Sequence, residues 1–116
     1  MTSDEYKNIV SHQSDAWNKV VSDSAGLLQL AHRKSWNELL ELHAKRDQEL
    51  KDFFAQALAQ DLVKTVQADL EKIRQTDQEI VQLVKKNQDE LSAEAQQLNQ
   101  MKKRISDYIS AEKSKL

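Results

Sequence analysis

The residues of this chain best suited to acid–base or metal chemistry are its three histidines. His12, His32 and His43 stand far apart in the sequence and show neither the HxxxH nor the HExxH spacing of a zinc site. A metal site or a general base needs ligands or partners that converge on one point. We therefore expect packed or solvated histidines, no metal and no cofactor. With a single glycine, a glycine-rich phosphate loop is excluded as well. The sequence predicts that this protein is not an enzyme.

A second candidate is the basic run at residues 102–104, Lys-Lys-Arg, which could contact phosphate. The chain as a whole carries a net charge of −2 and has an isoelectric point near 5.9. Nucleic-acid binding depends on a surplus of positive charge, so that class of partner is not favoured. We interpret the run as a solvated helix face, with phosphate binding as the alternative.

Composition points to one fold class. The chain has 116 residues, one glycine, no proline and no cysteine. Hairpins need Gly, Asn-Gly or Pro, whereas Ala, Leu, Glu, Gln, Lys and Arg favour helices. We expect a single all-α domain over residues 1–116 without disulfides. No apolar run is long enough to span a membrane, and the acidic start differs from a secretory signal, so we expect a cytoplasmic protein.

Apolar spacing predicts the first two helices. Thr2 and Glu5 have the spacing of a capping box, which places the first helix at about 3–33. Ser35 and Glu38 form a second such pattern, which places the next helix at about 36–55. The stripe of the first helix comprises Tyr6, Val10, Gln13, Trp17, Val20, Ser24, Leu27 and Ala31. That of the second comprises Trp36, Leu39, Leu40, His43, Asp47, Leu50, Phe53 and Ala57.

A longer heptad pattern follows and predicts a third helix over 61–97. Asp77 and Asn87 interrupt its apolar seam, and we interpret both as polar residues that fix the register of packing. Because an unbroken helix to the C-terminus would outrun the first two, the helix must project or break, and residues 93–99 are the expected break. A short fourth helix over 101–113 then folds back. The predicted fold is an antiparallel bundle of three long helices plus a short C-terminal segment.

Two adjacent phenylalanines, Phe53 and Phe54, suggest a contact surface. Neighbouring helix positions lie about 100° apart, so both rings cannot point into a narrow core. One ring is expected in the core and the other partly exposed, as a candidate anchor for a partner.

Three segments resemble one known family. The stretch "LLQLAHRKSWNELLELHAKRDQEL" (27–50) resembles the L-L-x-L-A-x-x-x-x-W-x-x-L pattern of the FliT-type flagellar export chaperones. "LEKIRQTDQEIVQLVKKNQDEL" (70–91) is similar to the long third helix of that family, and "SDYIS" (106–110) to its terminal element. Trp17 departs from the family pattern.

The resemblance implies a bacterial, cytoplasmic chaperone. Such proteins bind the C-terminal helices of the flagellar filament-capping protein and deliver it to the export ATPase complex. Some members also bind a transcriptional regulator of flagellar genes. A C-terminal helix that covers part of the binding surface is also implied.

On this basis we predict a partner-binding groove and a lid. The groove residues are Phe53, Phe54, Leu58, Val63 and Val66. The lid residues are Met101, Ile105, Tyr108 and Ile109, which share one face of the short fourth helix. Two other interpretations stay open: a spectrin-like three-helix scaffold, which would suit Trp17, and a coiled-coil adaptor that forms a homodimer.

Overall fold

The computed structural model describes residues 2–87 and 95–113, and every regular element among them is helical. The elements are α1 (Ser3–His32), α2 (Trp36–Phe54), a short 3-10 helix η1 (Gln60–Leu62), α3 (Val63–Lys86) and α4 (Ala95–Lys113). The predicted all-α bundle with a short C-terminal helix is confirmed.

The start of α1 and the turn into α2 are set by local hydrogen bonds. Thr2 and Glu5 form the predicted capping box. After α1, Lys34 adopts a left-handed conformation with φ of 59°, and the Ser35 amide donates to the Leu30 carbonyl oxygen at 3.0 Å. This is the Schellman ending of a helix, here with lysine at the position that usually holds glycine. The predicted capping box at Ser35 is wrong: its ψ of 70° departs from the extended backbone of Thr2, and its side chain makes no capping hydrogen bond.

The third helix is shorter than predicted. It ends at Lys86, not at 97, because Asn87 leaves the helical conformation and its Nδ2 donates to the Leu83 carbonyl oxygen at 2.7 Å. Asparagine side chains compete for backbone groups in this way and favour helix ends. The expected break at 93–99 is misplaced, since residues 95–99 belong to α4, and residues 93 and 94 lie outside the described part. The fourth helix begins at Ala95, earlier than the expected 101.

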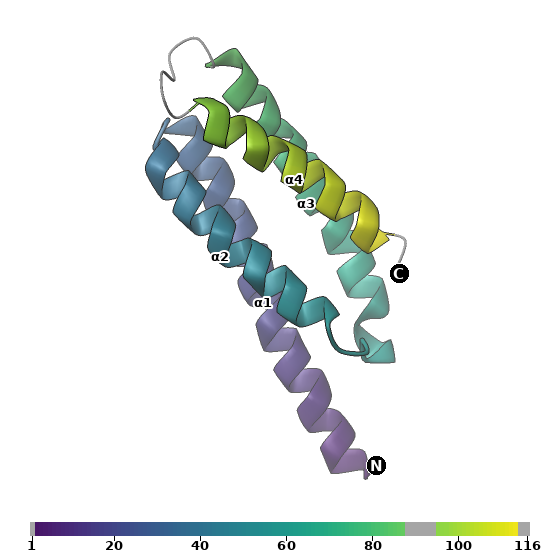
Figure 1. The fold of residues 1–116 in the computed structure, drawn as a ribbon. Helices are drawn as coiled ribbons and strands as arrows, with labels where there is room; N and C mark the ends of the chain where they lie inside the picture. Colours follow the sequence, from purple (N-terminus) through teal and green to yellow (C-terminus); the bar gives the residue numbers. More distant parts are fainter. Residues whose placement is uncertain (1, 88–94, 114–116) are drawn as a thin grey trace.

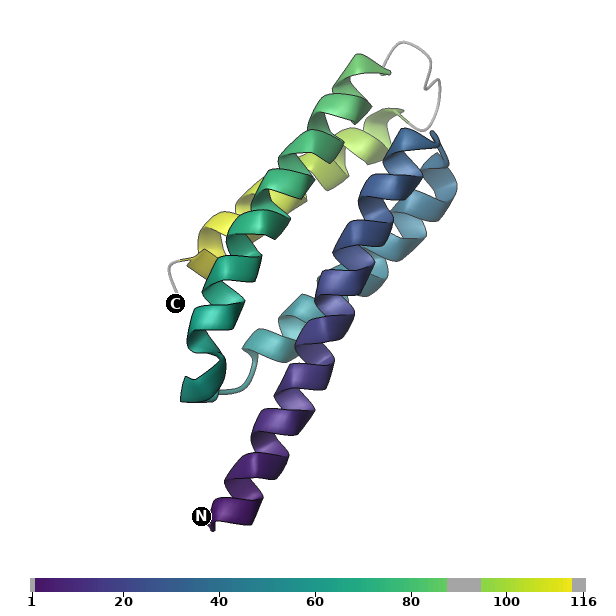
Figure 2. The same cartoon turned by 180° about the vertical axis from the view of Figure 1, so that it is seen from behind.

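The helices form an elongated body of 56 × 24 × 19 Å. The long helix α1 packs along both α2 and α3, and α4 packs on α2 and α3 from the opposite side (Figure 1). Seen from behind, α1 lies in front and its N-terminal part extends beyond the α2–α3 connection (Figure 2). Ile9 of α1, which lines a hollow together with Gln56 of the connection, is 36% exposed.

Side chains from all four helices share one hydrophobic core. The buried stripe of α1 matches the predicted one from Gln13 to Ala31. Leu39, Val66, Ile80 and Leu98 have no exposed surface. Burying a side chain of this size contributes about 1.5–3 kcal/mol, so α4, which adds Leu98, Met101 and Ile105, belongs to the folded core of the resting protein.

Candidate partner-binding surface

The predicted groove residues gather where α2 connects to α3, but they differ in exposure. Phe53 is buried and Phe54 half-buried, as expected for adjacent helix positions. Val66 is fully buried, whereas Leu58 and Val63 are half-buried. The Phe53 ring lies 5.0 Å from both the Trp17 ring and the Phe54 ring, measured between centroids. Phe53 and Val66 therefore support the core, and the half-buried residues are the accessible part of the predicted groove.

Polar clamps from α1 fix this end of the bundle. Gln13 Nε2 donates to the Ala57 carbonyl oxygen at 2.9 Å, and the Ala59 amide donates to Gln13 Oε1 at 2.8 Å. Trp17 Nε1 donates to Asp69 Oδ2 at 2.9 Å. The sequence signalled these contacts only by placing a polar residue, Gln13, in an apolar stripe. They make the α2–α3 connection part of a rigid scaffold.

Two of the predicted lid residues seat α4 on the bundle. Met101 is 3% and Ile105 4% exposed, and Leu98, one turn earlier, is fully buried. The side chains of Tyr108 and Ile109 lie outside the described part of the structure, so their predicted role as lid residues stays a prediction.

The described contacts of α4 fall on the middle of α2 and α3. Arg104 reaches Asp47 on α2, and Ile105, Ser106 and Ser110 line a cavity of about 640 Å³ against α3. The α3 residues at this cavity are Arg74, Asp77, Gln78, Glu79, Val81 and Gln82. Phe53 and Val66 lie one to three helical turns further along their helices. The described contacts of α4 are thus neighbours of the groove residues along the bundle axis.

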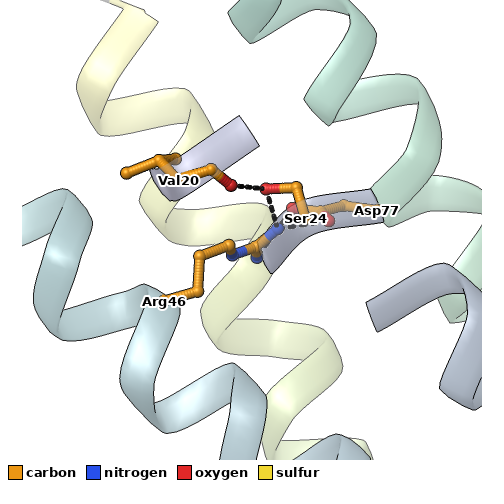
Figure 3. A network of polar contacts seen from close by, with 4 residues as sticks. All are labelled: Val20, Ser24, Arg46 and Asp77. Atoms are coloured by element: carbon orange, nitrogen blue, oxygen red, sulfur yellow. Dashed lines mark hydrogen bonds and ion pairs between the residues drawn. The ribbon is translucent and has the colours of Figure 1, made fainter. Parts of the chain in front are cut away.

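A buried ion pair links α2 to α3 beneath α4. Arg46 donates to Asp77 from both terminal guanidinium nitrogens, Nη1 and Nη2, at 2.7 and 2.9 Å, and Nη1 also donates to Ser24 Oγ at 3.2 Å (Figure 3). Ser24 in turn donates to the Val20 carbonyl oxygen at 2.8 Å. Burial raises the pKa of Asp77, and the charge and hydrogen bonds of Arg46 act against this. Asp77 was predicted as a register residue. Its partner Arg46 was missed, although its spacing of three from His43 and four from Leu50 places it on the buried face of α2, because Asp47 was assigned to that turn of the stripe.

The residue next to Arg46 faces α4. Asp47 Oδ2 accepts from Arg104 at 2.8 Å and lies 3.1 Å from Lys51 Nζ. One turn earlier on α2, His43 is buried, and this burial together with the Arg46 charge lowers its pKa to about 4. His43 is therefore neutral near pH 7, packed as the sequence predicts.

The described residues also bear on metal binding and on membrane insertion. Among the side chains that the structure describes, no group of three or more His, Asp or Glu residues is placed to hold a metal ion. Within the same residues, no helix has the length and apolarity that a membrane crossing requires.

Comparison with known proteins identifies the family. The family model described as flagellar protein FliT matches residues 14–110. No curated protein and no solved structure gives a match. The matched range contains both the α2–α3 connection and the α4 contacts described above. It covers most of the chain, and the chain therefore belongs to the FliT family of flagellar export chaperones.

Proposed function

We propose that this protein binds the C-terminal helices of the flagellar filament-capping protein in the bacterial cytoplasm and delivers it to the export ATPase complex. The proposed binding surface is the face of α2 and α3 that α4 covers, continued by Phe54, Leu58 and Val63 at the end of the bundle. Family membership and the packing of α4 support the proposal.

One observation carries it. The backbones of α2 and α3 each approach those of α1 and α4 closely but approach one another at few points, and the Arg46–Asp77 ion pair joins the two helices directly. Removal of α4 would leave an apolar channel between them, with α1 as its floor. A channel between two helices accepts the apolar face of a third helix, which is a common mode of peptide recognition. A client helix would then occupy the place of α4, and α4 would cover the channel when the client is absent.

The length of the channel favours a helix longer than the described contact of α4. Half-buried Phe54 and Leu58 pack against the core just beyond the residues that α4 contacts. A client helix that follows the channel would contact Phe54 and Leu58 in addition to the residues that α4 now contacts. These additional contacts would offset part of the cost of displacing α4.

The test is calorimetric titration of the capping protein's C-terminal helical segment into the full chain and into the variant Met101→Ala/Ile105→Ala. Both substitutions remove buried contacts of α4, so the closed state loses stability and client affinity rises, by about tenfold or more. Lys103→Ala, an exposed change on the same helix, is the matched control and leaves affinity unchanged.

The outcomes distinguish binding of the client from the role of α4 as a lid. Binding that is equal in all three chains would keep the chaperone and remove the lid. Absence of binding in all three would remove the capping protein as the client. Sedimentation of the free chain tests the homodimer that a coiled-coil adaptor would form. A transcriptional regulator of flagellar genes remains a second proposed partner, supported by the family resemblance.

A further inference from the structure

The contact of α4 with the bundle has a simple pattern. Its described buried residues, Leu98, Met101 and Ile105, follow the spacing i, i+3, i+7, which is one face of a helix. Arg104, one position before the last of them, reaches sideways to Asp47 on α2 at 2.8 Å. The helix therefore presents three apolar side chains and one cation to the channel.

When α4 is displaced, Asp47 on α2 loses its contact with Arg104. Its side chain is only 11% exposed, although Arg104 itself is 57% exposed. Lys51 on the same helix lies 3.1 Å from the carboxylate and stays in place when α4 leaves. A mostly buried carboxylate under an apolar helix needs more than one partner, because desolvation of a charge is costly.

Other carboxylates near the channel have partners that do not leave. Glu79, which lines the cavity beside Ile105, lies 3.5 Å from His32 Nε2 of α1. Both carboxylate oxygens of Asp77 accept hydrogen bonds from Arg46 of α2. Asp69 accepts from Trp17 of α1. Among Asp47, Asp69, Asp77 and Glu79, Asp47 is the one with a partner on the helix that the client would displace.

We propose that Asp47 is a specificity-determining residue: the client helix that displaces α4 carries an Arg or Lys that takes the place of Arg104 on Asp47. The expected client pattern is apolar residues at i, i+3 and i+7 with a basic residue at i+6, as in α4 itself. An amphipathic helix with an acidic or apolar residue at i+6 is rejected, since it buries the Asp47 carboxylate against a like charge or without its second partner. This inference rests on the proposed function.

The experiment compares two full-length variants, Arg104→Ala and Arg104→Ala/Asp47→Asn. In both, the bond between Asp47 and Arg104 is already absent, and the double-mutant cycle with the probe separates the client's contact with Asp47 from the effect of the Asp47 charge on α4. The probe is the capping protein's C-terminal helical segment, measured by calorimetry. The matched control is Arg104→Ala/Asp52→Asn, because Asp52 is an exposed carboxylate on the same helix that accepts a hydrogen bond from Gln48. Thermal unfolding of each variant verifies that it is folded.

A charge pair at a partly exposed site is worth up to about fivefold in affinity. We expect the Arg104→Ala chain to bind about two- to fivefold more tightly than the natural chain, and addition of Asp47→Asn to reverse that gain, whereas Asp52→Asn does not. Replacing the matching basic residue of the probe by alanine should abolish the effect of Asp47→Asn in a double-mutant cycle.

Equal affinity of the Arg104→Ala and Arg104→Ala/Asp47→Asn chains would overturn the proposal while leaving the chaperone function intact. Equal losses for Asp47→Asn and Asp52→Asn would also overturn it, because they would show a general charge effect. If the natural chain and all variants fail to bind the probe, the proposed function itself is wrong and this inference with it.

Discussion

The three-helix body and α4 are both held by apolar contacts and by ion pairs, but the ion pairs differ in how deeply they are buried. Within the body, polar side chains reach from one helix to another in buried surroundings: the Arg46 and Asp77 side chains are 3% and 1% exposed. Between the body and α4, the corresponding pair joins Asp47 to Arg104, which is 57% exposed. Arg46 and Asp47 are adjacent on α2. This helix therefore carries, side by side, a buried ion pair to α3 and a partly exposed ion pair to α4.

The difference shows how a small bundle combines a stable scaffold with a removable part. Breaking a buried ion pair leaves an uncompensated charge, whereas an exposed pair is replaced by water at little cost. The body is therefore expected to unfold as a unit, and α4 to open locally at lower free energy. Four predictions test this contrast, from the largest expected effect to the smallest.

The largest effect is expected from Asp77→Ala. This change leaves the Arg46 guanidinium buried without its carboxylate and lowers the free energy of unfolding by about 3–5 kcal/mol. Urea unfolding monitored by circular dichroism measures it. In the double variant Arg46→Met/Asp77→Leu, apolar side chains of similar size replace both charges, and most of the stability returns. A double variant as unstable as Asp77→Ala would show that the loss comes from packing and not from the unpaired charge.

The sequence predicted this region only in part, for physical reasons. The helical stripes follow from apolar periodicity, and the positions of Gln13, Ser24, Asp47 and Asp77 within stripes marked them as buried. The stripes do not show which distant side chain satisfies each buried polar group. Arg46 lies on the buried face of α2 between His43 and Leu50, but a charged residue there gives no indication of its own that a carboxylate from another helix pairs with it.

The end of α3 and the exposure of the binding-surface residues were even less predictable from the sequence. Asn87 occupies a seam position in the heptad pattern, yet its side chain bonds to the Leu83 carbonyl oxygen and ends the helix. The same residue type suits both roles, so spacing alone cannot separate them. Phe53 and Phe54 were predicted as groove residues because both rings cannot point into a narrow core, but the spacing does not tell which of the two is buried. Exposure depends on where α1 lies, and that is set by tertiary packing.

The second prediction concerns acid. Burial lowers the pKa of His43 from 6.5 to about 4, so the folded protein binds this proton less readily than the unfolded chain. Stability is therefore unaffected by this group above pH 6.5 and falls as the pH drops from 6.5 toward 4, by about 3 kcal/mol in total. His43→Gln removes the titration. Thermal melts of both chains across this range should diverge as the pH falls, and parallel curves would contradict the prediction.

Glu49 needs a control in the same experiment. Burial and the neighbouring Asp23 raise the pKa of Glu49 to about 7. A raised carboxyl pKa stabilises the fold below the unfolded value of 4.5, and this contribution is lost as the pH rises through 7. Because it opposes the His43 effect, the comparison is made in the Glu49→Gln background.

The third prediction tests the clamp at the end of the body. Gln13→Ala removes two hydrogen bonds to the α2–α3 connection and leaves the buried Ala59 amide without its partner, at a cost of about 1–3 kcal/mol. Gln48→Ala, which removes an exposed hydrogen bond to Asp52, is the matched control and changes stability by less than about 0.5 kcal/mol. Equal effects in urea unfolding would show that the connection does not depend on the clamp.

The smallest effect on stability, and the most selective, is expected from Arg104→Ala. Its partner Asp47 retains Lys51, and Arg104 is more than half exposed, so screening by solvent limits the loss to less than about 1 kcal/mol. Hydrogen exchange locates that loss: the amides of α4 should exchange up to about fivefold faster, and those of α1, α2 and α3 should be unchanged. The effect should shrink at high salt, where the pair is screened in the natural chain too.

A uniform acceleration across all four helices would mean that α4 opens only when the whole protein unfolds. The weak pair would then be one more part of a single cooperative core, since α4 also contributes Leu98, Met101 and Ile105 to that core. Acceleration confined to α4 would mean that these three apolar contacts can release together while Arg46 and Asp77 stay joined beneath them. A client helix requires that second behaviour, because it must find the channel open while the body remains folded.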